Sequence, residues 1–174
     1  MKICILFMLF TLFLIVNNQT AYANKDNSSW ASLKYNKTYL RTGPSKDNKV
    51  IWVYKRKGLP LKILRKKNEW NEVLLPSNQR GWINSSQISK KRTIIIQNNK
   101  SFSEMALSKN KQIMMTDKNS KIIAYLQEGV IANLHECKKD FCEIEVKVKK
   151  EKYFFKNSYR LSGYIKKEFL WGVK

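Results

Sequence analysis

The segment WVYKRK, which begins at Trp52, combines aromatic and cationic side chains at strand spacing. In an extended chain Trp52 and Tyr54 lie on one face, because successive side chains alternate between faces. Lys55, Arg56 and Lys57 follow at the tip of an expected hairpin. Aromatic faces beside cations suit contact with a sugar or peptide that carries carboxylates. Two other interpretations stay open: Trp52 packs in a core, and the three cations form a solvated turn.

A second stretch, KYFFKNSYRL, also interleaves aromatic residues with Lys and Arg. Its candidate binding residues are Tyr153, Phe155, Tyr159 and Arg160. The same residues would serve equally well to cover the end of a β-barrel, so they form only a secondary candidate site.

The groups that an enzyme would need are scarce in this sequence. His135 is the one histidine, so a cysteine–histidine or serine–histidine site would have to use it. Glu143 and Glu145 share one strand face with Lys147, which is typical of a charged, solvated surface. The sequence has no phosphate-binding glycine loop and no metal-binding signature. We therefore expect no catalytic residue, no metal and no cofactor.

Cys137 and Cys142 flank the residues KKDF and are themselves flanked by strand-like residues. In an oxidising compartment this spacing favours a disulfide across a hairpin. Metal binding with His135 is the alternative, but three ligands in one hairpin do not make a closed zinc site.

The first residues predict export from the cytoplasm. A basic start at Lys2 precedes an apolar run over residues 3–16, and Ala21, Tyr22 and Ala23 follow a polar stretch. This order is that of a secretory signal peptide cleaved after Ala23. The alternative, an uncleaved anchor, needs about 20 apolar residues. We expect a periplasmic or extracellular protein with no stable transmembrane segment after cleavage.

The formal net charge is +21, from 34 Lys and Arg against 13 Asp and Glu. A strongly basic exported protein favours anionic partners. However, Lys, Asn and Ile are abundant along the whole chain, so part of this charge is equally well explained as compositional drift.

Short apolar runs broken by polar turns predict many short strands and no long helix. Two regions repeat: residues 49–64 resemble residues 121–136, and GWINSSQI from Gly81 resembles GYIKKEFL from Gly163. Trp70 corresponds to Phe141 in this alignment. A repeat of this kind predicts two copies of one small β-module. The expected boundaries are a signal peptide at 1–23, a first domain at 24–96, a linker at 97–104 and a second domain at 105–174.

The ordered motifs LRTGPS, VIWVYKRKGLPLKIL, NEWNEV and GWINSSQI resemble the bacterial SH3-like (SH3b) domain. The second copy is more diverged, since it lacks the Gly-Pro pair. The pairing of the copies resembles tandem SH3-like proteins of alphaproteobacteria. The resemblance implies an all-β fold of two small SH3-like barrels in tandem, with Trp52, Trp70 and Trp82 in the first core or at its rim. Phe141, Tyr164 and Trp171 would take these places in the second.

The resemblance also implies targeting to the cell wall or to periplasmic proteins. We expect a non-catalytic binding module that recognises peptidoglycan or another anionic envelope component. A periplasmic adaptor or regulator that binds an acidic envelope protein is the alternative, and nucleic acid is a less favoured partner. The first copy is the expected binder, because the second has Ala124 in place of Trp52 and Glu128 in place of Arg56.

Overall fold

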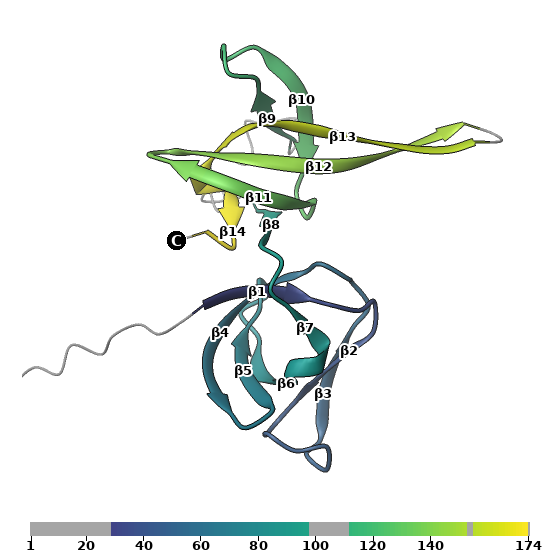
Figure 1. The fold of residues 1–174 in the computed structure, drawn as a ribbon, viewed down its shortest axis with the longest axis vertical. Coiled ribbons are helices and arrows are strands. Elements are labelled where there is room, and N and C mark those ends of the chain that lie inside the picture. The colour runs from purple at the N-terminus through teal and green to yellow at the C-terminus, as the bar shows by residue number, and fades with distance from the viewer. Residues whose placement is uncertain (1–28, 98–111, 153–154, 174) are drawn as a thin grey trace, which may run out of the picture.

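The computed structural model describes residues 29–97, 112–152 and 155–173. These residues form strands and two short 3-10 turns, and none of them belongs to an α-helix. The all-β class is therefore confirmed, and the strands form two seven-stranded sheets, one above the other in Figure 1. The expected signal peptide and most of the expected linker lie outside the described residues. Among the described residues, no helix is long and apolar enough to cross a membrane.

The first sheet has the strand order β3-β2-β6-β5-β4-β1-β7, and its hydrogen-bonded neighbours are antiparallel. A 3-10 turn, η1 (Ser85–Gln87), precedes its last strand. The strands are β1 (Ser29–Leu33), β2 (Thr38–Arg41), β3 (Val50–Tyr54), β4 (Pro60–Lys67), β5 (Trp70–Leu74), β6 (Arg80–Asn84) and β7 (Ile88–Ser89).

The second sheet has the order β10-β9-β13-β12-β11-β8-β14. Its hairpin of β12 and β13 has twelve residues in each strand and projects beyond the rest of the sheet (Figure 1). The strands are β8 (Thr93–Ile96), β9 (Gln112–Thr116), β10 (Ile122–Gln127), β11 (Ile131–Lys138), β12 (Phe141–Lys152), β13 (Phe155–Lys166) and β14 (Leu170–Trp171), with η2 (Lys167–Phe169) before the last.

The two sheets have the same strand order, with each label shifted by seven. Backbone hydrogen bonds repeat as well: Leu33 N donates to Leu59 O, and Ile96 N donates to Val130 O, both at 2.9 Å. Strand β8 is thus the counterpart of β1, and the second sheet begins at Thr93. This differs from the expected end of the first domain after residue 96. The reason is that β8 pairs with β11 and β14 and with no strand of the first sheet.

The predicted equivalences at two other points agree with the strand registers. Trp70 opens β5 and Phe141 opens β12, and both follow tight turns. A Cβ on Gly81 would lie 2.8 Å from Arg41 O, and one on Gly163 would lie 2.7 Å from Thr116 O. Glycine at these positions lets a neighbouring strand approach closely.

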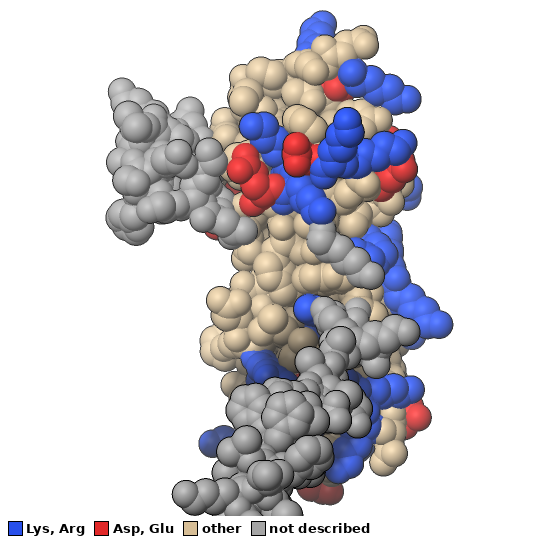
Figure 2. All heavy atoms as spheres, turned by 90° about the vertical axis from the view of Figure 1, so that its left-hand side faces the viewer, with Lys and Arg blue, Asp and Glu red and all other residues tan. Residues whose placement is uncertain are grey.

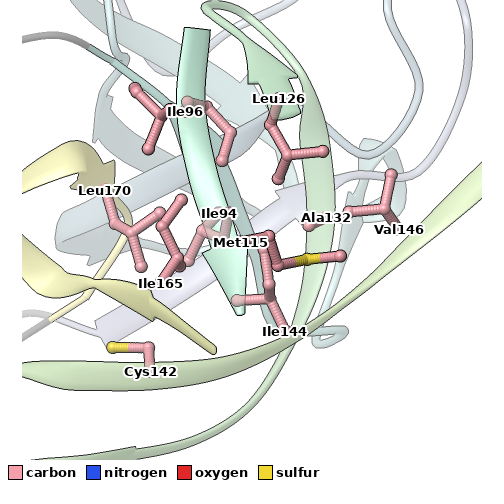
Figure 3. Packing of buried hydrophobic residues seen from close by; sticks show 11 residues of the cluster. Ile94, Ile96, Met115, Leu126, Ala132, Cys142, Ile144, Val146, Ile165 and Leu170 are labelled. Carbon is pink, nitrogen blue, oxygen red and sulfur yellow. The ribbon is translucent and has the colours of Figure 1, made fainter. Parts of the chain in front are cut away.

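Each sheet encloses its own apolar core, and both cores are built mainly from aliphatic side chains. The expected role of the large aromatic residues holds in part: Trp82 is buried, and Trp70, Tyr164 and Trp171 are half-buried. Trp52 and Phe141 are exposed, and Trp171 packs against the first core instead of the second. Leucine, isoleucine and valine fill the interior instead. Figure 3 shows this for the second core, where β8 contributes Ile94 and Ile96.

The predicted disulfide is confirmed. Cys137 in β11 and Cys142 in β12 are directly paired across the hairpin, with Cα atoms 4.0 Å apart and their sulfurs bonded. Cys142 is fully buried, whereas His135 is exposed. The thiolates that the metal alternative requires are therefore consumed in the disulfide.

Candidate functional site

Trp52 and Tyr54 lie on β3, at the edge of the first sheet. The Trp52 side chain is 52% exposed, so this residue does not pack in the core. Its ring lies 6.4 Å from the Tyr54 ring, which is half-buried against the first core. The two rings therefore form the aromatic face that the sequence predicted, with Trp52 as its accessible part.

The Tyr54 hydroxyl is held by the loop after β5. It donates a hydrogen bond to Gln79 Oε1 and lies 3.4 Å from Ser77 Oγ. Burial raises the pKa of Tyr54, although the hydrogen bond to Ser77 opposes this shift. Tyr54 is thus a neutral phenol at physiological pH, and its orientation is fixed.

The three cations after Tyr54 point to different places. Lys55 is exposed, whereas the Arg56 guanidinium donates a hydrogen bond to Gly129 O in the second domain. Lys57 lines a cavity at the junction of the two domains. Backbone hydrogen bonds also show that Gln127 is the counterpart of Arg56, and that Glu128 is the counterpart of Lys57, one position away from the sequence alignment.

The secondary candidate residues lie in or next to β13. Tyr153 lies outside the described residues, and so does the side chain of Phe155. Tyr159 is 51% exposed. Arg160 pairs with Lys147 across β12 and β13, and its guanidinium lies 3.5 Å from the Glu145 carboxylate.

A cavity of about 670 Å³ lies between the two domains, and we call it the interdomain cleft. It brings together Lys57 and Arg160, which the sequence assigned to separate sites. Its other cations, Lys34, Lys91 and Lys147, were not among the predicted residues. Figure 2 shows cations along the edge of the molecule at the level of this junction. No sequence pattern distinguishes these lysines from the other lysines of so basic a chain.

Two hydrogen bonds fix the floor of the interdomain cleft, one between the domains and one from β1 to the segment that precedes β8. Thr93 Oγ1 donates to Gly58 O at 2.8 Å, and Ser32 Oγ donates to Lys91 O at 2.9 Å. Ser32 and Thr93 are buried, while the cations around them are exposed. The interdomain cleft thus has a rigid polar floor beneath a cationic rim.

Glu145 is the single carboxylate among the described residues that line the interdomain cleft. Asn133 Nδ2 donates to it at 2.8 Å, and this hydrogen bond lowers the pKa of Glu145, with the nearby charges of Arg160 and His135 adding to the effect. Five cations and one carboxylate leave four net positive charges. Because Glu145 is already engaged by Asn133 and Arg160, the interdomain cleft presents a surface for anions.

Within the described ranges, no group of three or more His, Cys, Asp or Glu side chains is placed to hold a metal ion. The cleft contains hydroxyl groups on Ser32, Ser89 and Thr93. His135 is absent from its lining, so the cleft does not join a histidine base to these hydroxyls.

Residues 34–90 match the family model described as Bacterial SH3 domain, so the first domain is similar to this family over nearly its whole sheet. A comparison with curated proteins finds no match to the sequence. Among solved structures, the chain is similar to NlpC2 from Trichomonas vaginalis, with 10% identity and a TM-score of 0.32, over 84% of this chain and 48% of that one. NlpC1 from the same organism gives 11% identity and a TM-score of 0.32, over 86% and 48%. The chain thus spans about half the length of these structures. At TM-scores this low, neither the fold nor the function of these proteins is assigned to this chain.

Proposed function

We propose that this protein is a non-catalytic binding module of the bacterial cell envelope, which holds an anionic wall component, foremost peptidoglycan, in the interdomain cleft. The observation that carries the proposal is the convergence of five cations around one carboxylate that is already engaged. The match of residues 34–90 to the bacterial SH3 domain supports a binding role. The repeated strand order supports a tandem pairing of the type that the sequence resembles.

The chemistry of the ligand follows from the lining. Binding pockets for small molecules and sugars span about 300–1,000 Å³, and the interdomain cleft falls within this range at about 670 Å³. Peptidoglycan carries carboxylates on its stem peptides and muramyl groups, which complement Lys57 and Lys147. Trp52 offers a separate flat surface for a sugar ring. The basic, apolar and small-residue order of residues 1–23 supports export to the compartment where this polymer lies.

A protein partner is the second candidate, and one observation favours it. Met114 and Tyr125 are directly paired on β9 and β10, and they are 56% and 58% exposed. Exposed apolar pairs of this kind occur at protein interfaces. An acidic envelope protein would contact this pair in the alternative function.

The test is sedimentation of the exported protein with purified peptidoglycan at rising salt. Screening shortens the reach of exposed charges to about 5 Å near 0.3 M salt, so nonspecific adhesion is lost there while binding in the interdomain cleft persists. We expect Lys34→Gln, Lys57→Gln and Lys147→Gln together to abolish the salt-resistant fraction. The matched control carries Lys66→Gln, Lys67→Gln and Lys121→Gln, which remove the same charge from exposed positions outside the cleft lining.

The same assay separates the alternatives. If Trp52→Ala removes binding and the cleft variant does not, the aromatic face of β3 is the site. If both triple variants lose binding equally, only net charge matters and the proposal is wrong. Copurification of one stoichiometric protein without peptidoglycan binding would favour the adaptor.

A further inference from the structure

The two walls of the interdomain cleft come from different domains, and direct contacts hold them together. Thr93 Oγ1 donates to Gly58 O, and the Arg56 guanidinium donates to Gly129 O. Gly58 and Gly129 occupy equivalent turns, with φ values of 80° and 83°. Because these turns are tied to the other domain at backbone atoms, the spacing between the two walls is set by the fold.

Each wall carries a pair of neighbouring cations. On the second domain, Lys147 and Arg160 are directly paired across β12 and β13, so their side chains share one face of the sheet. On the first domain, Gly58 N donates to Leu33 O at 2.8 Å, and Lys57 N donates to Asn36 Oδ1 at 3.2 Å. These bonds bring the turn with Lys57 beside the turn that begins at Lys34.

We infer that the interdomain cleft selects a compact ligand with at least two anionic groups, of which each domain holds one. The inference rests on the proposed function, since both place an anion in this cleft. A ligand with two anionic groups engages both cation pairs, and the second contact forms at high effective concentration once the first is made. A ligand with one anionic group reaches only one wall and binds more weakly. Phosphate and carboxylate groups can both supply the negative charges that the two cation pairs bind.

The experiment is isothermal titration of the full exported chain with inorganic triphosphate, citrate and inorganic phosphate at about 0.15 M salt. Triphosphate and citrate represent the phosphate and carboxylate sources of the anionic groups. We expect one molecule of the preferred polyanion per chain, with affinity at least about tenfold above that for inorganic phosphate. Removing one charge-assisted contact should cost about tenfold, so Lys57→Gln and Lys147→Gln should each weaken polyanion binding by about this factor. The control variant Lys66→Gln should bind the polyanion with an affinity within about twofold of the wild-type value.

The two single variants, Lys57→Gln and Lys147→Gln, separate one bridged ligand from two independent sites. For a bridged ligand, both single substitutions weaken the same binding event and the stoichiometry remains one. Two binding events per chain, each sensitive to one substitution only, would overturn the inference. Equal affinity for phosphate and for both polyanions would also overturn it. Polyanion binding without peptidoglycan sedimentation would leave the inference standing and refute the proposed function. Peptidoglycan sedimentation without polyanion binding would support the proposed function and overturn the inference.

Discussion

Glu72 is a buried carboxylate in β5 of the first domain, and two arginines hold its charge. Arg80 Nε donates to Glu72 Oε1 at 2.8 Å, and Arg65 Nε donates to Oε2. Arg65 also lies over the Trp82 ring, 5.2 Å from its centroid. Burial alone would raise the pKa of Glu72, but the hydrogen bonds from Arg80 and Arg65 outweigh it and lower the pKa below the ordinary 4.5.

This arrangement predicts how Glu72→Gln changes stability with pH. A lowered folded-state pKa contributes stability above the ordinary value, and that contribution is lost as pH falls through the folded-state pKa. Because both arginines are largely exposed, we expect Glu72→Gln to reduce the free energy of unfolding by only about 1–2 kcal/mol at pH 7. The difference should be smaller at pH 3 than at pH 7, because the carboxylate becomes protonated as pH falls through its lowered folded-state pKa. Urea unfolding at the two pH values measures it.

The exposed Glu69 provides the control. Glu69→Gln should change the unfolding free energy by less than about 0.5 kcal/mol at either pH. A Glu72→Gln effect of equal size at pH 7 and pH 3 would show that the carboxylate charge contributes nothing.

Individual site residues were only partly predictable from the sequence. Strand alternation placed Trp52 and Tyr54 on one face, and their rings do lie 6.4 Å apart. The exposure of Trp52 was left open by the sequence, and the hydrogen bond that orients Tyr54 was not foreseen. Lys57 and Arg160 were chosen for separate sites because each belongs to a different copy of the repeat. Their convergence depends on how the domains dock, which no local pattern encodes.

At the scale of elements, the β11–β12 hairpin is held by both its register and its disulfide. Leu134 pairs with Ile144, and Lys138 pairs with Phe141, so the backbone ladder continues on either side of the cysteines. The disulfide therefore stabilises a hairpin whose register is already specified.

Replacing both cysteines, Cys137→Ala/Cys142→Ala, should consequently lower stability without unfolding the second domain. Losing a cross-link that closes so short a loop costs about 2 kcal/mol in the chain-entropy treatment. We expect urea unfolding to show this loss, while circular dichroism keeps the native strand signal. The wild-type protein in reducing agent is the control and should unfold at nearly the same urea concentration. An unchanged midpoint in the double variant under oxidising conditions would contradict the prediction.

The strand β8 shows where element-level prediction reached its limit. The run TIII indicates a buried strand, and all four of its residues are indeed buried. However, a strand that is buried on both faces has no polar side to indicate its sheet. The repeat alignment began only at residue 49, beyond β1, so the correspondence between β1 and β8 could not be seen.

At the scale of the whole molecule, β8 joins the two cores. Ile94 and Ile96 point into the second core, whereas Ile95, which alternates with them, is 6% exposed and packs in the first core. Ile131 and Trp171, also from the second domain, pack against that first core. Trp30 and Trp171 meet edge to face across the junction, with ring centroids 4.9 Å apart. The first domain is thus completed by side chains that the second domain carries.

This sharing predicts that the two domains unfold together, and that Ile95→Ala separates them. The substitution Ile95→Ala deletes apolar contacts with the first core at a cost of about 2–4 kcal/mol. The two domains should then unfold in two separate transitions. Ile94→Ala, one residue away, weakens only the second core and should lower the midpoint of a transition that stays single. Calorimetry checks this, since a single cooperative transition gives equal calorimetric and van't Hoff enthalpies. A single transition in Ile95→Ala would show that the coupling between the domains does not depend on Ile95. Two transitions in the wild-type protein would show that the junction is a contact between independent domains, and the interdomain cleft would then lack the fixed spacing that its two cationic walls require.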